Sequence, residues 1–223
     1  MWRIERRILQ ARGHDVFSPT LTGLGERRHL ASPTVNLSLH IADVVNELEL
    51  EDLHDVILVG HGYGGMVVTG VVDRVPRRIA QLVYLDAFVP EGGQALADIV
   101  PQRRVLEDGW LMPALPETRL GRIEPGGLPD PTIWRLVNQR GPQPFLTMTE
   151  PLRLTNPSAP ELPRSYIYCT DKEQSDVFEQ FARRLAADPL WRSYQIDTDH
   201  YPMLTTPREL AEILSTIASG GST

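Results

Sequence analysis

This chain of 223 residues contains one cysteine, Cys169, so an intrachain disulfide cannot form. Proteins of reducing compartments generally lack disulfides, which favours a cytoplasmic location. No apolar run approaches the roughly 20 residues that a membrane-spanning helix needs. The N-terminal residues also lack the apolar segment of a signal peptide. We therefore expect a soluble protein that is neither exported nor inserted in a membrane.

Basic residues are scarce, because 22 lysines and arginines stand against 29 acidic residues and give a net charge of -7. Nucleic-acid binding needs a concentrated basic surface, so we expect no nucleic-acid partner. Four of the six histidines (His14, His29, His40 and His54) lie in unrelated contexts without metal-ligand spacing. The glycine-rich stretch GHGYGG, residues 60–65, is too short and wrongly spaced for a dinucleotide-binding motif or a P-loop. We expect neither a metal nor another cofactor. The expected partner is a small molecule, and the protein could also form an oligomer.

Strand and helix patterns alternate along much of the chain. Residues 56–59 and 80–88 are continuous apolar runs, as expected of parallel strands covered on both faces. Residues 14–19, 165–169 and 191–196 also predict strands. Helices are predicted for residues 2–12, for 38–48 with Ser38 as N-cap, for a stretch ending near 187 capped by Ser175 or Asp176, and from Pro207 onward. This order predicts an α/β fold with a mostly parallel sheet and helices on both faces.

Residues 90–163 differ from the rest because they contain 13 of the 19 prolines. Long helices are disfavoured there, so short segments joined by turns are expected. The block follows a strand end, which would place it as a cap over the carboxyl edge of the sheet, where open α/β folds bind ligands. We therefore divide the chain into a core of residues 1–89 and 164–223 and a cap of residues 90–163.

The stretch DVILVGHGYGGMVV, residues 55–68, carries the most informative motif. Its central residues, Gly60-His61-Gly62-Tyr63-Gly64, match the nucleophile-elbow pattern G-x-S-x-G except at the middle position. That position holds Gly62 instead of serine.

Four segments together resemble the α/β-hydrolase superfamily: GHDVFSPTLTGLGERRHLASP, VILVGHGYGGMVV, LVYLDAFVPEGGQ and DTDHYPMLTTPRELAEIL. More narrowly, they are similar to its small esterase and hydroxynitrile-lyase branch, which includes salicylate-esterase-like bacterial enzymes. The resemblance implies an order of elbow, acid and histidine. His200 matches the histidine, and the acid is Asp171, Glu173 or Asp176. We favour Asp171 because it lies nearest the end of a strand, while Asp176 could equally cap a helix.

The sequence departs from this family pattern at two places. Gly62 has no hydroxyl with which to attack a carbonyl carbon. The first residues resemble the helix that follows the family's first central strand, so that strand and its oxyanion loop are expected before residue 1 and are absent. Either the reading frame is truncated or misassigned, or the strand predicted near residues 15–18 takes an unusual neighbour.

Part of the hydrolase chemistry survives without the serine. His200 oriented by Asp171 could act as a general base, and the Tyr63 N–H at a helix N-terminus could stabilise an anion. Gly62 leaves space for water or a substrate atom. Such a site could abstract a proton next to a carbonyl, activate water, or catalyse elimination or carbon-carbon cleavage. The alternatives are a catalytically dead small-molecule binder, or an inactivated or truncated serine esterase.

Residues around the elbow have both binding and packing interpretations. His61 more naturally packs beside the elbow than performs chemistry. Asp86 could face the pocket, although capping the turn after its strand is the simpler role. Trp110 and Trp134 could form an aromatic pocket wall or a small core within the cap. We expect a small, largely apolar substrate, for example an aromatic or polyketide-like compound.

Overall fold

The computed structural model describes residues 1–100, 107–114, 120–156, 162–172 and 176–220. The larger of its two sheets has the strand order β1-β2-β5-β6, and every pairing in that sheet is parallel. The strands are β1 (Val56–Gly62), β2 (Ile79–Ala87), β5 (Arg164–Cys169) and β6 (Trp191–Ile196). The predicted parallel α/β architecture is confirmed.

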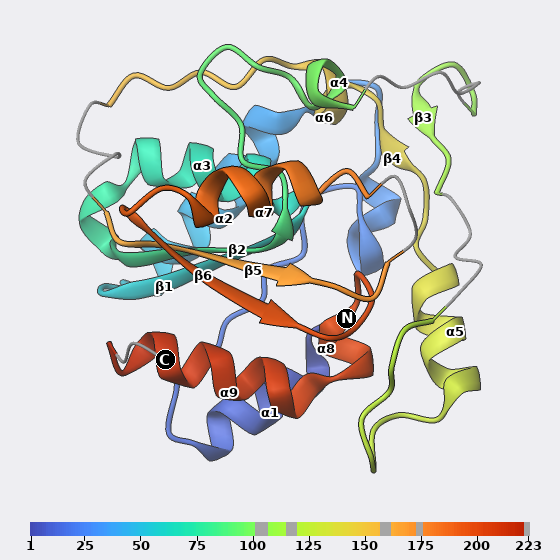
Figure 1. Ribbon diagram of the computed structural model, residues 1–223. Coiled ribbons are helices and arrows are strands. Elements are labelled where there is room, and N and C mark those ends of the chain that lie inside the picture. Colours follow the sequence, from blue (N-terminus) through green and yellow to red (C-terminus); the bar gives the residue numbers. More distant parts are fainter. Residues whose placement is uncertain (101–106, 115–119, 157–161, 173–175, 221–223) are drawn as a thin grey trace.

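Helices cover both faces of this sheet (Figure 1). Successive side chains of a strand point to opposite faces, and β2 shows this clearly. Leu82 and Tyr84 belong to one apolar cluster, whereas Val83 and Leu85 belong to the other. The first cluster is covered by α2 (Leu37–Leu50), α3 (Gly64–Arg74) and α7 (Glu179–Ala186), and α1 (Arg3–Ala11) and α9 (Pro207–Ala218) cover the opposite face.

Between β2 and β5 the described elements are short, as the prolines predicted. The longest is α5, which lies beyond the carboxyl ends of β5 and β6 (Figure 1). Ile133 and Val137, one turn apart on α5, are fully buried in the same cluster as Val83 and Leu85. The division into core and cap stays a prediction. The elements of this segment are α4 (Leu96–Ile99), β3 (Leu111–Met112), α5 (Asp130–Asn138), β4 (Gln143–Pro144) and α6 (Leu146–Thr149).

The remaining described elements are short helical turns. They are η1 (Gly25–Leu30), η2 (Pro76–Arg78) and α8 (Pro202–Thr205). The last of them, α8, follows β6 after a short loop and leads into α9, so it lies at the carboxyl edge of the sheet.

Two local predictions were wrong. Residues 14–19 form no strand, because a strand needs a neighbouring backbone and β1 pairs with β2 alone among the described strands. The N-cap of α2 is Asn36 instead of Ser38, since the Asn36 side chain accepts a hydrogen bond from the Leu39 N–H. Ser38 instead donates its N–H and hydroxyl to the Glu150 carboxylate. Ser175 lies outside the described residues.

The start of α3 packs very closely on the end of β2. A β-carbon added to Gly65 would lie 1.9 Å from the Phe88 carbonyl oxygen, so only glycine fits there. At the adjacent Gly64, an added β-carbon meets no described atom within 4 Å. This contact holds the elbow against the β2 end.

We expect Gly65→Ala to lower the free energy of unfolding by about 2 kcal/mol or more, because the methyl group must displace backbone atoms. Gly64→Ala is the matched control, and it should leave stability unchanged or slightly higher, since alanine favours helix. Urea denaturation of both variants measures the difference. Equal effects of the two substitutions would contradict the proposed close contact.

Glu5 on α1 is a buried carboxyl whose two oxygens have no hydrogen-bond partner among the described residues. Burial raises the pKa of Glu5 to about 9, and the nearby Glu124 adds to the shift. The folded protein therefore holds a proton on Glu5 at neutral pH, which the unfolded chain releases. Stability contributed by this proton is present below the ordinary carboxyl pKa and is lost as the pH rises toward 9.

We expect Glu5→Gln to remove this pH dependence. Relative to the parent, the variant should gain about 2 kcal/mol or more in the free energy of unfolding between pH 5 and pH 8. Urea denaturation at both values measures the change. A difference between the two proteins that does not vary with pH would show that Glu5 is ionised in the fold.

Candidate functional site

The turn between β1 and α3 has the strand-turn-helix form of a nucleophile elbow. Gly62 lies at its apex with φ +54°, a conformation that L side chains rarely adopt. A β-carbon built on Gly62 would lie 3.1 Å from His200 Nε2. Apart from the adjacent residues, the His200 ring supplies the only described atoms within 4 Å of that position.

His200 lies in the loop between β6 and α8, as expected. The loop is fixed by Asp199, whose carboxylate accepts hydrogen bonds from the Tyr201 and Gly121 N–H groups. The His61 ring donates from Nε2 to the His200 carbonyl oxygen at 2.6 Å. The His200 side chain keeps 26% of its surface exposed, so a small molecule can reach it.

The carboxylate that orients His200 is Asp86, which corrects the expectation for Asp171. Asp86 Oδ2 lies 2.6 Å from His200 Nδ1. Since a carboxylate can only accept, Nδ1 carries the proton and Nε2 is left to face Gly62. The expected arrangement of a carboxylate, an imidazole and the elbow is therefore present with a different acid.

Asp86 reaches His200 because β2 is irregular at that residue. In the pairing with β1, His61 is opposite Leu85 and Gly62 is opposite Ala87, so Asp86 is the extra residue of a bulge, with φ +43°. Bulges redirect side chains at strand ends. Asp86 is completely buried, and its carboxylate is directed at His200. The signal in the sequence was a carboxylate interrupting an apolar strand.

Two of the three acids proposed after β5, Asp171 and Asp176, contact groups other than His200. The Asp171 carboxylate accepts a hydrogen bond from the Arg122 N–H, and its own N–H donates to Thr198. Asp176 accepts hydrogen bonds from the Phe178 N–H and from the Tyr168 hydroxyl. The N-cap of α7 is Phe178, whose side chain makes no capping hydrogen bond, so the prediction that Asp176 caps the helix was wrong. Asp176 also pairs with Lys172 at 2.7 Å. Glu173 lies outside the described residues.

His61 packs beside the elbow, with its ring centroid 4.3 Å from that of His200. Burial lowers the pKa of His61 to about 3, and the nearby His200 adds to the effect. The neutral ring can therefore hold the His200 backbone without adding charge to the site.

Tyr63 occupies the N-cap position of α3, so its N–H belongs to the group of amides at a helix start that can stabilise an anion. Its hydroxyl donates to His40 Nδ1, and His40 Nε2 donates to the Thr22 carbonyl oxygen. His40 is fully buried. This chain of contacts anchors the elbow to the loop before α2.

Trp110 and Trp134 are both partly buried, in the β3 turn and on α5. No ring contact joins either of them to His200 in the part of the chain that the structure describes. The roles of these two tryptophans stay predictions.

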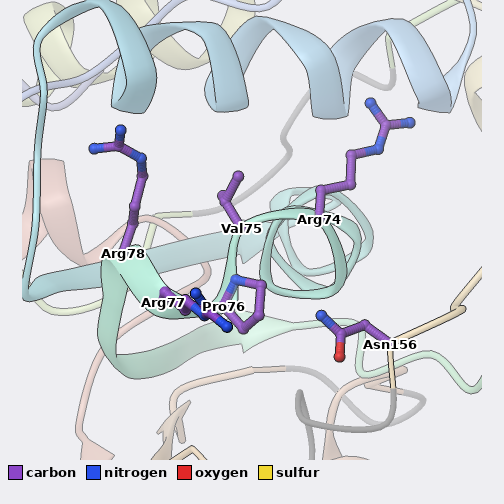
Figure 2. Close-up of a pocket in the computed structure, with 6 residues that line it drawn as sticks. All are labelled: Arg74, Val75, Pro76, Arg77, Arg78 and Asn156. Carbon is purple, nitrogen blue, oxygen red and sulfur yellow. The ribbon is translucent and has the colours of Figure 1, made fainter.

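Two hollows of the structure lie away from His200. The larger, about 650 Å³, has Thr69, Tyr84, Leu154 and Trp191 among its lining residues. Figure 2 shows the smaller, of about 310 Å³, which is bordered by Arg74, Val75, Pro76, Arg77, Arg78 and Asn156. Neither hollow is lined by Gly62, His200 or the two tryptophans, so both are separate from the elbow.

The described histidines, cysteine and acids form no group of three that could hold a metal ion. In the same parts of the chain, no helix has the length and apolar character needed to cross a bilayer.

The low pKa of His61 predicts acid sensitivity. The unfolded chain binds a proton near the ordinary histidine pKa, whereas the folded protein does so only near pH 3, so stability is lost as pH falls below about 6.5. Replacing the ring by the amide of glutamine keeps a donor for the His200 carbonyl. Relative to the parent, His61→Gln should gain about 1 to 2 kcal/mol between pH 7 and pH 5, measured by urea denaturation. A constant difference would refute a neutral His61.

Comparison with known proteins identifies the family of this chain. A carbendazim hydrolyzing esterase from Nocardioides sp. (strain SG-4G) is 38% identical, over 97% of this chain and 93% of the relative. An extracellular alpha/beta-hydrolase from a Paenibacillus species, with homology to tobacco salicylic acid binding protein 2, superposes with a TM-score of 0.78 at 26% identity, covering 96% and 92% of the two chains.

Tomato methylketone synthase I complexed with 2-tridecanone has a TM-score of 0.79 at 17% identity, covering 99% and 93%, and shares the fold. A family model described as "Alpha/beta hydrolase family" matches residues 1–213. The elbow, the histidine after β6 and these matches agree, and the chain belongs to the alpha/beta hydrolase family.

Proposed function

We propose that this protein acts on a small, largely apolar carbonyl compound through general acid-base chemistry at His200, without an acyl-serine intermediate. The observation that supports this proposal is the orientation of one ring. Nδ1 is held by Asp86 at 2.6 Å, and Nε2 faces the position above Gly62, 3.1 Å from where a β-carbon would be. A neutral imidazole in this tautomer is a base aimed at the elbow.

The reaction follows from what lies around Nε2. The imidazole takes a proton from water or from a carbon next to a carbonyl, and the imidazolium that forms is stabilised by the Asp86 carboxylate. Negative charge then develops on the substrate oxygen. The Tyr63 N–H at the start of α3 is the donor we assign to that oxygen. No covalent bond to the protein forms, because Gly62 has no nucleophilic atom.

The substrate class is inferred from the relatives and from the sequence. The bacterial relative is named for hydrolysis of carbendazim, and the tomato neighbour was solved with a ketone. We therefore place the substrate among small carbonyl compounds with an aromatic or alkyl part. Trp110 and Trp134 are the residues that we expect to contact this part.

A second candidate, an inactivated serine esterase that at most binds ligands, is favoured by the backbone at Gly62. Serine at φ +54° costs on the order of 1 to 3 kcal/mol of strain, which glycine avoids. Replacement by glycine thus stabilises the turn while removing the nucleophile.

Gly62→Ser tests the arrangement of the elbow and His200, which both candidate functions assume. The new hydroxyl would lie beside His200 Nε2, so we expect a burst of 4-nitrophenol from 4-nitrophenyl acetate, in amounts matching the enzyme. Gly62→Ala, which has the same backbone strain and no hydroxyl, is the control and should give no burst. Absence of a burst in the serine variant, when it is folded, would show that the ring is not aimed as described.

His200→Gln tests the acid-base proposal in the parent protein. We expect turnover of any carbonyl compound found in a panel of aryl esters, carbamates and β-keto acids to fall by about 10² to 10⁴-fold, the typical contribution of a general base. Product formation is followed by chromatography. Turnover that survives His200→Gln would overturn the proposal. A parent inactive on the whole panel beside an active Gly62→Ser variant would favour the inactivated esterase.

A further inference from the structure

The Asp86 carboxylate binds a second charged group besides His200. Lys172 Nζ lies 2.6 Å from Asp86 Oδ1, the oxygen that does not face the imidazole. The lysine side chain is 13% exposed and Asp86 is fully buried, so the pair is poorly screened by solvent. One carboxylate is therefore shared between an ammonium and an imidazole.

Asp176 extends this arrangement by one more charge. Its Oδ2 lies 2.7 Å from Lys172 Nζ and accepts a hydrogen bond from the Tyr168 hydroxyl, while its Oδ1 accepts from the Phe178 N–H. The Phe178 ring in turn stacks on His200, with centroids 4.9 Å apart and planes 9° apart. Lys172 Nζ also lies 5.0 Å from the centre of the Phe178 ring.

We propose that Lys172 and Asp176 are positioning residues that set the proton affinity of His200 through Asp86, an inference that rests on the proposed use of His200 as a base. Lys172 holds Oδ1 and so turns Oδ2 toward Nδ1. Its positive charge also offsets part of the field that Asp86 and Asp176 exert on the imidazole. Without the ammonium, two buried carboxylates would favour a protonated His200, which cannot act as a base.

Other charged and titratable groups also lie near His200 in the part of the chain that the structure describes. His61 is neutral above about pH 4 because of its low pKa. Arg140, which lies 5.0 Å over the Tyr201 ring, keeps a fixed charge at all working pH values. Among the described residues, the charged and titratable groups around His200 are His61, Asp86, Lys172, Asp176, Asp199, Tyr201 and Arg140.

Removing the charge of Lys172 and removing that of Asp176 should shift the titration of His200 in opposite directions. Lys172→Met removes a positive charge, so the pH midpoint of the His200 ring signals should rise by about one unit. Asp176→Asn removes a negative charge and leaves the size of the side chain nearly unchanged. It should lower that midpoint by less than Lys172→Met raises it. Lys172→Arg keeps the charge and should stay near the parent value.

Proton NMR of the histidine ring signals between pH 4.5 and 9 measures this, with His200→Gln used to assign the resonance. Loss of packing alone would not give shifts that follow the sign of the removed charge. Shifts of the same sign in Lys172→Met and Asp176→Asn, or no shift in either folded variant, would overturn the inference. If Lys172→Met does not fold, Asp176→Asn and Lys172→Arg still decide, because a midpoint raised or unchanged in Asp176→Asn contradicts it.

The titration needs no turnover, so this inference and the proposed function fail separately. A protein without activity on the panel can still show the two opposed shifts, which would uphold the electrostatic role of Lys172 and Asp176. Conversely, turnover of the parent could depend on His200 while the His200 midpoint stays the same in Lys172→Met and Asp176→Asn. That result would support the proposed function and contradict this inference.

Discussion

The buried carboxylate of Asp86 is the group on which the site depends. An ionised carboxylate removed from water is very costly unless donors surround it. Three donors do so: His200 Nδ1, Lys172 Nζ and the Cys169 N–H at 3.3 Å. They come from the loop after β6, the segment after β5 and the last residue of β5. The same interactions that accommodate the charge thus join neighbouring carboxyl ends of the sheet and orient the imidazole.

The shape of the elbow and the presence of a nucleophile are separate properties. The turn needs a residue at positive φ, and glycine meets that need without strain. The packing of α3 on β2 depends on Gly65 against Phe88, which is also independent of the side chain at position 62. The orientation of His200 depends on Asp86 and His61. A serine could therefore be absent without disturbing the base or the helix N-terminus.

The sequence predicted the parts of this site that depend on local pattern. The apolar runs located β1 and β2, the glycines located the turn, and the resemblance placed His200 after the last strand. Asp86 was misassigned because its direction is set by a bulge between β1 and β2, which no local pattern reveals. Asp171 was favoured by its nearness to the end of β5, but its carboxylate faces the Arg122 backbone. Residues 14–19 failed as a strand since strand formation depends on a neighbour.

Two buried carboxyl groups, Glu5 and Asp86, differ in the number of hydrogen-bond donors that surround them. Glu5 is as deeply buried but has no donor among the described residues, so its pKa rises to about 9 and it holds a proton. A neutral carboxyl could not stabilise an imidazolium. Asp86 receives one backbone and two side-chain donors, one of them an ammonium. It follows that the chemistry available to His200 is decided as much by Lys172, on the far side of the carboxylate, as by the residue at the elbow.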